Sequence, residues 1–175
     1  MRKNLISSIG VADKILSMNP DNEAWLGDLV ELSGDPLEYI ELLYAHFTRD
    51  FIDSRPQLEG VQVLHDGNDD NGKCACFVHI TSKDDEDAGG RVVDLRRCER
   101  LCWIRPIIEN SDKDEVLRWD EVKGRQRRIF LYVAEERFLV ILEERKYGYM
   151  LVTAYYVEGN NSHQRFLKKY QRYSI

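Results

Sequence analysis

The sequence predicts an α+β protein in which helices come first and an antiparallel sheet follows. The first part of the chain contains segments with apolar residues three and four positions apart, which is the spacing of one helix face. The later part contains short alternating or apolar segments joined by tight turns, which is the pattern of hairpin-linked strands. Three such strands in succession predict an antiparallel meander that buries one face against the helices.

Helical patterns occupy the chain up to about residue 55. Two short helices are predicted in LISSIGVADKILS and PDNEAWLGDLVEL, the second with Pro20 near its start. The clearest helix has Asp35 as its N-cap and Pro36 at its first position, and it should end before Pro56. Its apolar residues follow helical spacing: Leu37, Ile40, Tyr44, Phe47 and Phe51.

The period of the pattern changes after residue 56. GVQVLHD and KCACFVHITS are predicted to be strands of a hairpin with DGNDDNG as its turn, and KDDEDAGG is predicted to be a loop. An arginine-rich segment follows. After it, strands are predicted in VLRWDEV, RRIFLYVA, RFLVILEER and YGYMLVTAYYVE. The chain closes on SHQRFLKKYQRY, a predicted basic helix with Ser162 as its N-cap.

The length of 175 residues fits one ordinary domain, because such a chain can bury a sizeable core. We expect a single compact unit in which residues 1–34 form a helical extension and residues 35–175 the main domain. The 43% apolar and 32% charged composition is that of a globular protein. No apolar run approaches the roughly 20 residues that span a bilayer, and the N-terminus is a poor signal peptide. We therefore expect a cytoplasmic protein with no membrane partner.

Charge is distributed unevenly along the chain. Residues 1–90 contain 7 Lys and Arg against 18 Asp and Glu, whereas residues 91–175 contain 18 against 13, and the whole chain has a net charge of −6. The basic residues cluster with aromatic ones, which favours contact with an anionic partner. In the alternative interpretation, the acidic half keeps the protein soluble or shields its own basic site.

Motifs that bind metals or nucleotides are not evident in the sequence. There is no glycine-rich phosphate loop, no nucleophile elbow and no His-Glu-x-x-His. DGNDDNG lacks the twelfth-position glutamate and the flanking helices of a calcium loop. The four cysteines could in principle bind zinc, but their spacing is not that of the usual knuckles, so buried reduced thiols are the simpler interpretation: Cys74, Cys76, Cys98 and Cys102. We expect no metal and no other cofactor.

Among the four histidines, His79 has the setting best suited to proton transfer. It is predicted to end an apolar strand just before a polar loop, where an imidazole can exchange protons near pH 7. The alternative is an ordinary strand histidine that is packed or exposed. His46 lies on the long predicted helix, and His65 and His163 lie near turns, which makes each a weaker candidate.

The segment DLRRCERLCWIRPIIEN, residues 94–110, places four arginines among apolar residues: Arg96, Arg97, Arg100 and Arg105. In one interpretation the apolar side chains face inward and the guanidinium groups pair with nearby acids. In the other, some arginines converge on a phosphate, to which the planar guanidinium fork is well matched. If the segment is helical, Arg96 and Arg100 share a stripe and Arg97 lies within reach of it. The residues alone leave both interpretations open.

The last predicted strand contains LVTAYYV and carries further polar groups. Alternation sends Thr153 and Tyr155 to one face of the sheet and Ala154 and Tyr156 to the other. The basic helix follows directly, so hydroxyl, phenol and ammonium groups are expected near the chain end. Strand tyrosines are equally ordinary as core residues.

Five stretches, in this order, resemble one nuclease superfamily: GKCACFVHI, DLRRCERLCWIRPIIEN, RRIFLYVAEERFLVILEER, YMLVTAYYV and FLKKY. They are similar to the phage and bacterial branch of the barnase, EndoU, colicin-type RNase and RelE superfamily, the BECR-like nucleases, over residues 35–173. The resemblance implies N-terminal helices packed on an antiparallel four-stranded β-meander. It also implies a toxin-like, metal-independent endoribonuclease. In that reaction the RNA 2′-hydroxyl attacks the adjacent phosphodiester and leaves a 2′,3′-cyclic phosphate.

On this resemblance, catalytic roles fall to His79, Arg97, Arg100, Thr153 and Tyr155. His79 would transfer a proton, and Arg97 and Arg100 would stabilise the charged phosphorane. Thr153 and Tyr155 would orient the phosphate, with Tyr155 also able to support the second proton transfer.

Substrate-binding roles would fall to Arg105, Trp103 and Lys169, with Trp103 stacking on a base and Lys169 as the alternative second proton donor. The partners implied are RNA, such as tRNA or ribosome-associated RNA, and an antitoxin or immunity protein. Two other functions stay open. One is a catalytically inert RNA- or protein-binding module of phage or defence origin, and the other is an immunity protein whose acidic first half caps a basic toxin.

Overall fold

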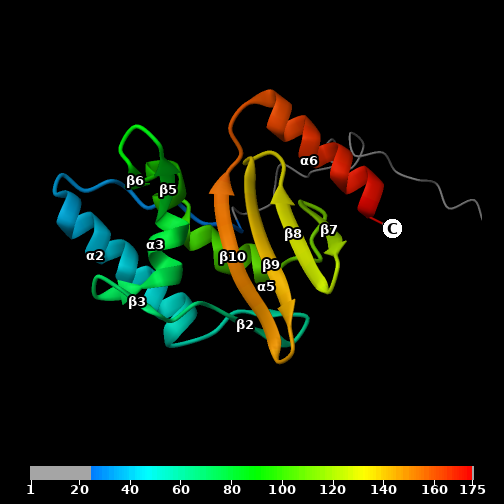
Figure 1. The fold of residues 1–175 in the computed structure, drawn as a ribbon, viewed down its shortest axis with the longest axis horizontal. Coiled ribbons are helices and arrows are strands. Elements are labelled where there is room, and N and C mark those ends of the chain that lie inside the picture. Colours follow the sequence, from blue (N-terminus) through cyan, green and yellow to red (C-terminus); the bar gives the residue numbers. More distant parts are fainter. Residues whose placement is uncertain (1–24, 175) are drawn as a thin grey trace, which may run out of the picture.

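The computed structural model describes residues 25–174, which form a curled six-stranded mixed sheet with helices on both faces (Figure 1). The strand order is β1-β2-β10-β9-β8-β7. The neighbours are antiparallel except for β2 and β10, which are parallel. The strands are β1 (Gln57–Leu58), β2 (Val61–Leu64), β7 (Val116–Lys123), β8 (Gln126–Val133), β9 (Phe138–Arg145) and β10 (Gly148–Tyr156).

The prediction of a four-stranded antiparallel meander under N-terminal helices is wrong. The segments β7 to β10 are adjacent and antiparallel, but β2 adds a parallel neighbour to β10 and β1 extends the sheet beyond it. The helices are also spread along the chain, and the last one covers the opposite face of the sheet (Figure 1). The pairing of β2 with β10 joins segments far apart in the sequence. A local hydrophobic period carries no information on such a pairing.

Helix α2 (Pro36–Phe47) begins as predicted. The Asp35 carboxylate accepts hydrogen bonds from the backbone N–H groups of Leu37 (2.7 Å) and Glu38 (3.2 Å), so the N-cap is confirmed. The helix continues as a π-helical turn, η1 (Thr48–Ile52), and ends before Pro56. Its buried stripe differs from the prediction, because Leu37 is 78% exposed; the buried side chains are Tyr39, Leu43, Phe47 and Phe51.

The segment KCACFVHITS is not a strand. Lys73–Cys74 form the short strand β4, paired with β3 (Asp69–Asp70), and the chain then turns into helix α3 (Ala75–Thr81). The buried side chains of α3 are Cys76, Phe77, Ile80 and Thr81, and their spacing is that of one helix face. An apolar run of this length fits either a strand or a helix, so its packing decided the outcome.

Two further segments differ from the sequence prediction. KDDEDAGG, predicted to be a loop, belongs to a hairpin of β5 (Ser82–Asp85) and β6 (Gly90–Val93). Of PDNEAWLGDLVEL, residues 25–32 contain no helix, and the rest, with LISSIGVADKILS, lies outside the described residues. The arginine-rich segment forms three short helical pieces: α4 (Leu95–Cys98), η2 (Leu101–Trp103) and α5 (Ile104–Glu109).

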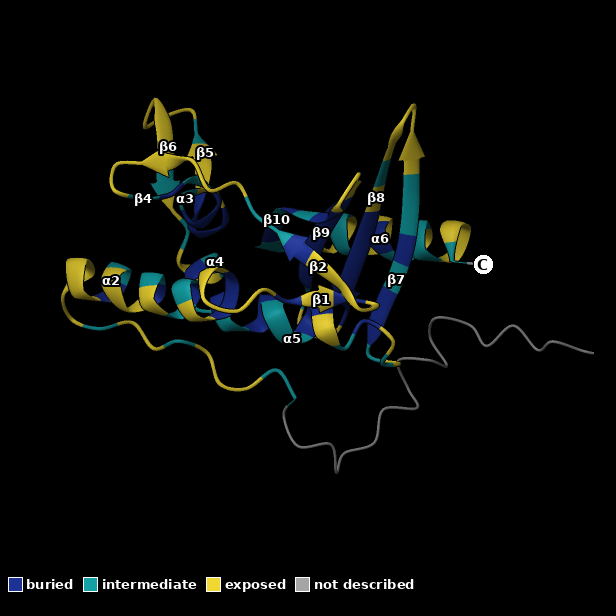
Figure 2. Ribbon diagram, turned by 90° about the horizontal axis from the view of Figure 1, so that it is seen from below, coloured by how far each residue is buried: buried dark blue, intermediate teal, exposed yellow. Residues whose placement is uncertain are grey.

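Two hydrophobic cores lie on opposite faces of the sheet (Figure 2). The larger joins one sheet face to α2, α3 and α5, and the smaller lies under helix α6 (Asn160–Tyr173), whose Phe166 packs on Trp119 and Tyr132. The N-cap of α6 is Gly159, not Ser162, because the chain turns there with a φ of 72°. Among the described helices, none is long and apolar enough to cross a membrane.

Candidate functional site

A cleft of about 400 Å³ lies between α3 and the edge of β10. Within the described sheet, β2 pairs with β10 only at Tyr149 and Met150, so the C-terminal half of β10 lacks a strand partner on that side. Helices α3 and α4 contact this open edge. The cleft is lined by Asp66, Asp70, Ala75, Cys76, Val78, His79, Arg91, Leu151 and Val152.

Two guanidinium groups converge on the last turn of α3. Arg91 Nη2 donates to the carbonyl oxygens of His79 (3.0 Å) and Ser82 (2.7 Å). Arg97 Nη1 donates to the same His79 carbonyl at 3.3 Å. Carbonyl groups at a helix C-terminus have no intrahelical partner and carry partial negative charge, which favours cations there. The fold thus brings together His79, Arg91 and Arg97 from three separate elements.

The imidazole of His79 is placed to act as a base. The residue is exposed on α3, yet its surroundings desolvate the ring enough to lower the pKa of His79 below its usual value. The positive charges of Arg91 and Arg97 lower it further, against the opposing effect of Asp84. The ring is therefore predominantly neutral at pH 7 and free to accept a proton.

Arg97 retains unused hydrogen-bonding capacity. Its side chain is 16% exposed, its Nε lies 3.6 Å from the Asp94 carboxylate, and burial lowers the pKa of the guanidinium. Within residues 25–174, its side chain makes one hydrogen bond, to the His79 carbonyl, and its buried Nε has an ion-pair partner but no hydrogen-bond partner. The group lies over the ring of Tyr155, with 5.4 Å from Cζ to the ring centroid. Several of its five donors thus remain for an anionic ligand.

Thr153 and Tyr155 lie on β10 immediately after an irregularity in the sheet. The β9–β10 register shifts between Leu151 and Thr153, and such bulges redirect the side chains that follow them. Tyr155 packs with the α6 core, whereas Ala154 and Tyr156 belong to the opposite core, so the predicted alternation is confirmed for these three. Burial raises the pKa of Tyr155 despite the opposing charges of Arg165 and Arg97, so its phenol stays protonated at pH 7.

Arg100 and Trp103 do not reach the cleft. The Arg100 guanidinium hydrogen-bonds to Glu99 and stacks on the rings of Tyr156 (4.9 Å) and Trp103 (5.2 Å). Arg96 stacks on the same Tyr156 ring at 4.7 Å, so the predicted Arg96–Arg100 stripe exists, but it contacts the larger core rather than Tyr155. Trp103 is 5% exposed and donates from its indole N–H to the Gly27 carbonyl (3.1 Å), which leaves no face for a base.

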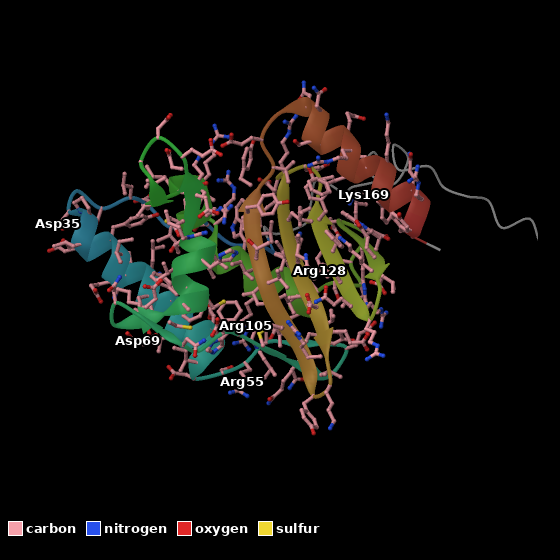
Figure 3. The ribbon with its side chains drawn as sticks, in the orientation of Figure 1. Asp35, Arg55, Asp69, Arg105, Arg128 and Lys169 are labelled. Carbon is pink, nitrogen blue, oxygen red and sulfur yellow. The ribbon has the colours of Figure 1, made fainter. Side chains whose placement is uncertain are left out.

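Arg105 and Lys169 are engaged elsewhere (Figure 3). Arg105 donates to the Ser54 carbonyl (2.8 Å) and pairs with Glu109 (3.0 Å), at a separate cleft of about 600 Å³ that Arg55 and Arg118 also line. Lys169 lies on α6 and contacts both carboxylate oxygens of Glu121 at 2.8 and 3.0 Å. Arg100 and Arg105 therefore follow the first interpretation of the arginine segment, in which the guanidinium groups pair with nearby acids.

Sequence reasoning missed Arg91. It lies on β6, and four of its five N–H donors are used: Nε donates to the Ser82 hydroxyl (2.9 Å), Nη1 to the Asp84 carboxylate (3.1 Å), and Nη2 to the two carbonyls at the end of α3. Its only signal in the sequence is an isolated cation after an acidic stretch. The hairpin that carries it to α3 was itself not predicted.

The thiols are mostly buried, as predicted. Cys74, Cys76 and Cys98 are buried and Cys102 is partly buried, and all four are free. Burial raises the pKa of Cys76 and Cys98 to about 12, so both are protonated and inert. In the described part of the chain, no group of three or more His, Cys, Asp or Glu side chains is arranged to hold a metal ion.

Comparison with known proteins identifies no relative of this chain. No family model, no curated protein and no solved structure matches it. The geometry of the cleft between α3 and β10 is therefore the basis on which a function can be argued.

Proposed function

We propose that this protein is a cytoplasmic, toxin-like endoribonuclease of the BECR-like type that cleaves RNA without a metal ion. The observation that supports the proposal most is the convergence of Arg91 and Arg97 on the backbone carbonyl of His79, with Arg97 also beside the Tyr155 ring. A neutral imidazole, guanidinium groups and a protonated phenol are the groups that RNA self-cleavage requires. An antitoxin or immunity protein would be the natural partner of such an enzyme.

Four side chains have roles in the proposed reaction: His79 lines the cleft, and the other three lie beside it on α4 and β10. His79 accepts the proton of the RNA 2′-hydroxyl while O2′ forms a bond to the adjacent phosphorus. Arg97 stabilises the negative charge that develops on the phosphorane, because it has donors free for the phosphate oxygens. The bond from phosphorus to O5′ then breaks, and Tyr155 donates a proton to the departing oxygen. Thr153 positions the phosphate, and the products are a 2′,3′-cyclic phosphate and a free 5′-hydroxyl.

Arg91 favours a second candidate, a catalytically inert binding module of the same fold. Four of the five N–H donors of its guanidinium are already used by acceptors within the protein, so it can offer at most one hydrogen bond to a ligand. In an inert module, Arg91 and Arg97 would serve to hold the hairpin, α3 and α4 together. The two functions differ in whether the His79 imidazole reacts.

Incubation of the purified protein with mixed RNA in EDTA at pH 6 to 8 tests the proposal. We expect cleavage products that end in 2′,3′-cyclic phosphate. His79→Ala should reduce the rate about 10²- to 10⁴-fold, which is the usual contribution of a general base. His46→Ala is the matched control, since His46 is in the last turn of α2 and outside the cleft, and it should cleave at the wild-type rate. Intact RNA would establish the inert module instead, whereas equal cleavage by His79→Ala would refute the role of His79 as the base.

A further inference from the structure

Helix α6 presents a row of cations and amides along one side. Arg165, Lys168 and Arg172 follow Asn161 at spacings of three and four, which places the four side chains on one helix face. Together with Gln164 and Lys169 they line a shallow hollow of about 430 Å³. The helix contains no acidic residue, although the chain as a whole has a net charge of −6.

The cations of this row, which we call the α6 stripe (Arg165, Lys168 and Arg172), are not neutralised by carboxylates. Within residues 25–174, none of the three forms an ion pair, whereas Lys169 on the adjoining face is paired with Glu121. The nearby carboxylate of Asp120 is in turn paired with Arg127. Elsewhere in residues 25–174, nine arginines are paired with acids and four are not (Arg55, Arg96, Arg125 and Arg137); the paired ones are Arg49, Arg91, Arg97, Arg100, Arg105, Arg118, Arg127, Arg128 and Arg145. The stripe is therefore a local positive surface on an acidic protein.

The α6 stripe lies on the same side of the sheet as Tyr155, because Phe166, which follows Arg165, belongs to the core against which Tyr155 packs. On the α4 side, the Arg97 guanidinium lies 5.4 Å from the centroid of the Tyr155 ring. From Arg165 to Arg172 the helix advances about 10 Å, at 1.5 Å per residue. A single strand whose bases stay stacked advances about 3.4 Å per nucleotide, so this length corresponds to about three phosphates. The amides of Asn161 and Gln164 add hydrogen-bond donors of the kind that contact phosphate and sugar.

We propose that the α6 stripe binds the phosphate backbone of single-stranded RNA that flanks the cleavage position. The substrate is then an RNA of several nucleotides, held by Arg165, Lys168 and Arg172 while one phosphodiester lies between α3 and β10. This inference rests on the proposed function, which makes the cleft between α3 and β10 the cleavage site. The continuity of the stripe with Tyr155 favours RNA over an acidic protein, which would have no need to approach the cleft.

The salt dependence of RNA binding tests this proposal without any cleavage. The full chain carrying His79→Ala is titrated with a fluorescent 12-nucleotide RNA across a salt series, alone and combined with Arg165→Gln, Lys168→Gln and Arg172→Gln. Three lost phosphate contacts should reduce the slope of log affinity against log salt by about 2, at about 0.7 for each contact on a single strand. Glutamine is a good helix former, so α6 should persist, and circular dichroism checks it. The matched control replaces Lys123, Arg125 and Lys146, exposed cations at the opposite end of the meander, with Gln and should keep the slope.

A second arm separates this inference from the nuclease proposal. With the active chain, the stripe variant should cleave a dinucleoside monophosphate with the wild-type KM and the 12-nucleotide RNA with a raised KM. If the wild-type chain cleaves neither RNA, the nuclease proposal fails. The salt dependence of RNA binding then still tests whether the α6 stripe binds RNA. Equal slopes for the stripe variant and the control would overturn the inference. So would stripe-dependent binding of polyglutamate with no binding of RNA, which would assign the surface to an acidic protein.

Discussion

Replacement of Arg97 by methionine should separate catalysis from stability. Arg97→Met removes one hydrogen bond of 3.3 Å to the His79 carbonyl, worth about 1 kcal/mol, and a cation–π contact with Tyr155, worth about 0.5–1 kcal/mol. It also removes a buried Nε that has no hydrogen-bond partner and lies 3.6 Å from the Asp94 carboxylate; leaving such a donor without a hydrogen bond costs about 1–3 kcal/mol. These terms nearly cancel, and methionine keeps the apolar contacts of the arginine stem.

Asp94 does not become an uncompensated charge in this variant. Its carboxylate still accepts hydrogen bonds from the backbone N–H groups of residues 96 (3.0 Å) and 97 (3.3 Å), and Lys83 lies 3.8 Å away. We therefore expect the free energy of unfolding of Arg97→Met to stay within about 1 kcal/mol of the wild type. The rate of RNA cleavage should fall about 10²- to 10³-fold, which is the effect of removing one donor from a charged transition state.

Urea denaturation and single-turnover cleavage of a defined RNA measure the two effects. Arg96→Met is the matched control, because Arg96 precedes Arg97 on α4 but stacks on Tyr156 at the other core. It should cleave within about twofold of the wild type. A loss of more than about 3 kcal/mol of stability in Arg97→Met, or an unchanged cleavage rate, would refute the reasoning and make Arg97 a structural residue.

Three other predictions concern pH, positioning and packing. The pKa values of His79 and His163 are lower in the folded than in the unfolded state, so the unfolded chain binds more protons just below pH 6.5. The free energy of unfolding in urea should therefore decrease as the pH falls below 6.5, and less so in His79→Gln. Arg91→Met should raise the pKa of His79 toward its usual value in an NMR titration, since one nearby positive charge is removed; Lys83→Met should leave it unchanged. Phe166→Ala should lower the free energy of unfolding by about 3–5 kcal/mol, because it leaves a cavity where the Phe166 ring packs on Trp119 and Tyr132. A decrease below about 1 kcal/mol in urea denaturation would contradict that packing.

The sequence by itself determined the elements whose pattern is local and long enough to be unambiguous. The four strands from β7 to β10 alternate or run apolar between tight turns, and they form where their patterns indicate. The start of α2 followed from the Asp35 cap, since the cap hydrogen bonds join residues only two and three positions apart. His79 was selected as a candidate base from its residue type and its place beside a polar loop.

Tertiary structure alone decided which charged groups meet. The seven residues of α3 fit a strand as well as a helix, and their burial against α2 and β10 selects the helix. That choice, with the unpredicted β5–β6 hairpin, brings Arg91 and Arg97 to the His79 carbonyl. The physical reason is range: caps, hydrophobic periods and the local ion pairs of Arg100 with Glu99 and of Arg105 with Glu109 act over a few residues. The contacts of Arg91 and Arg97 instead depend on how separate elements pack around β10.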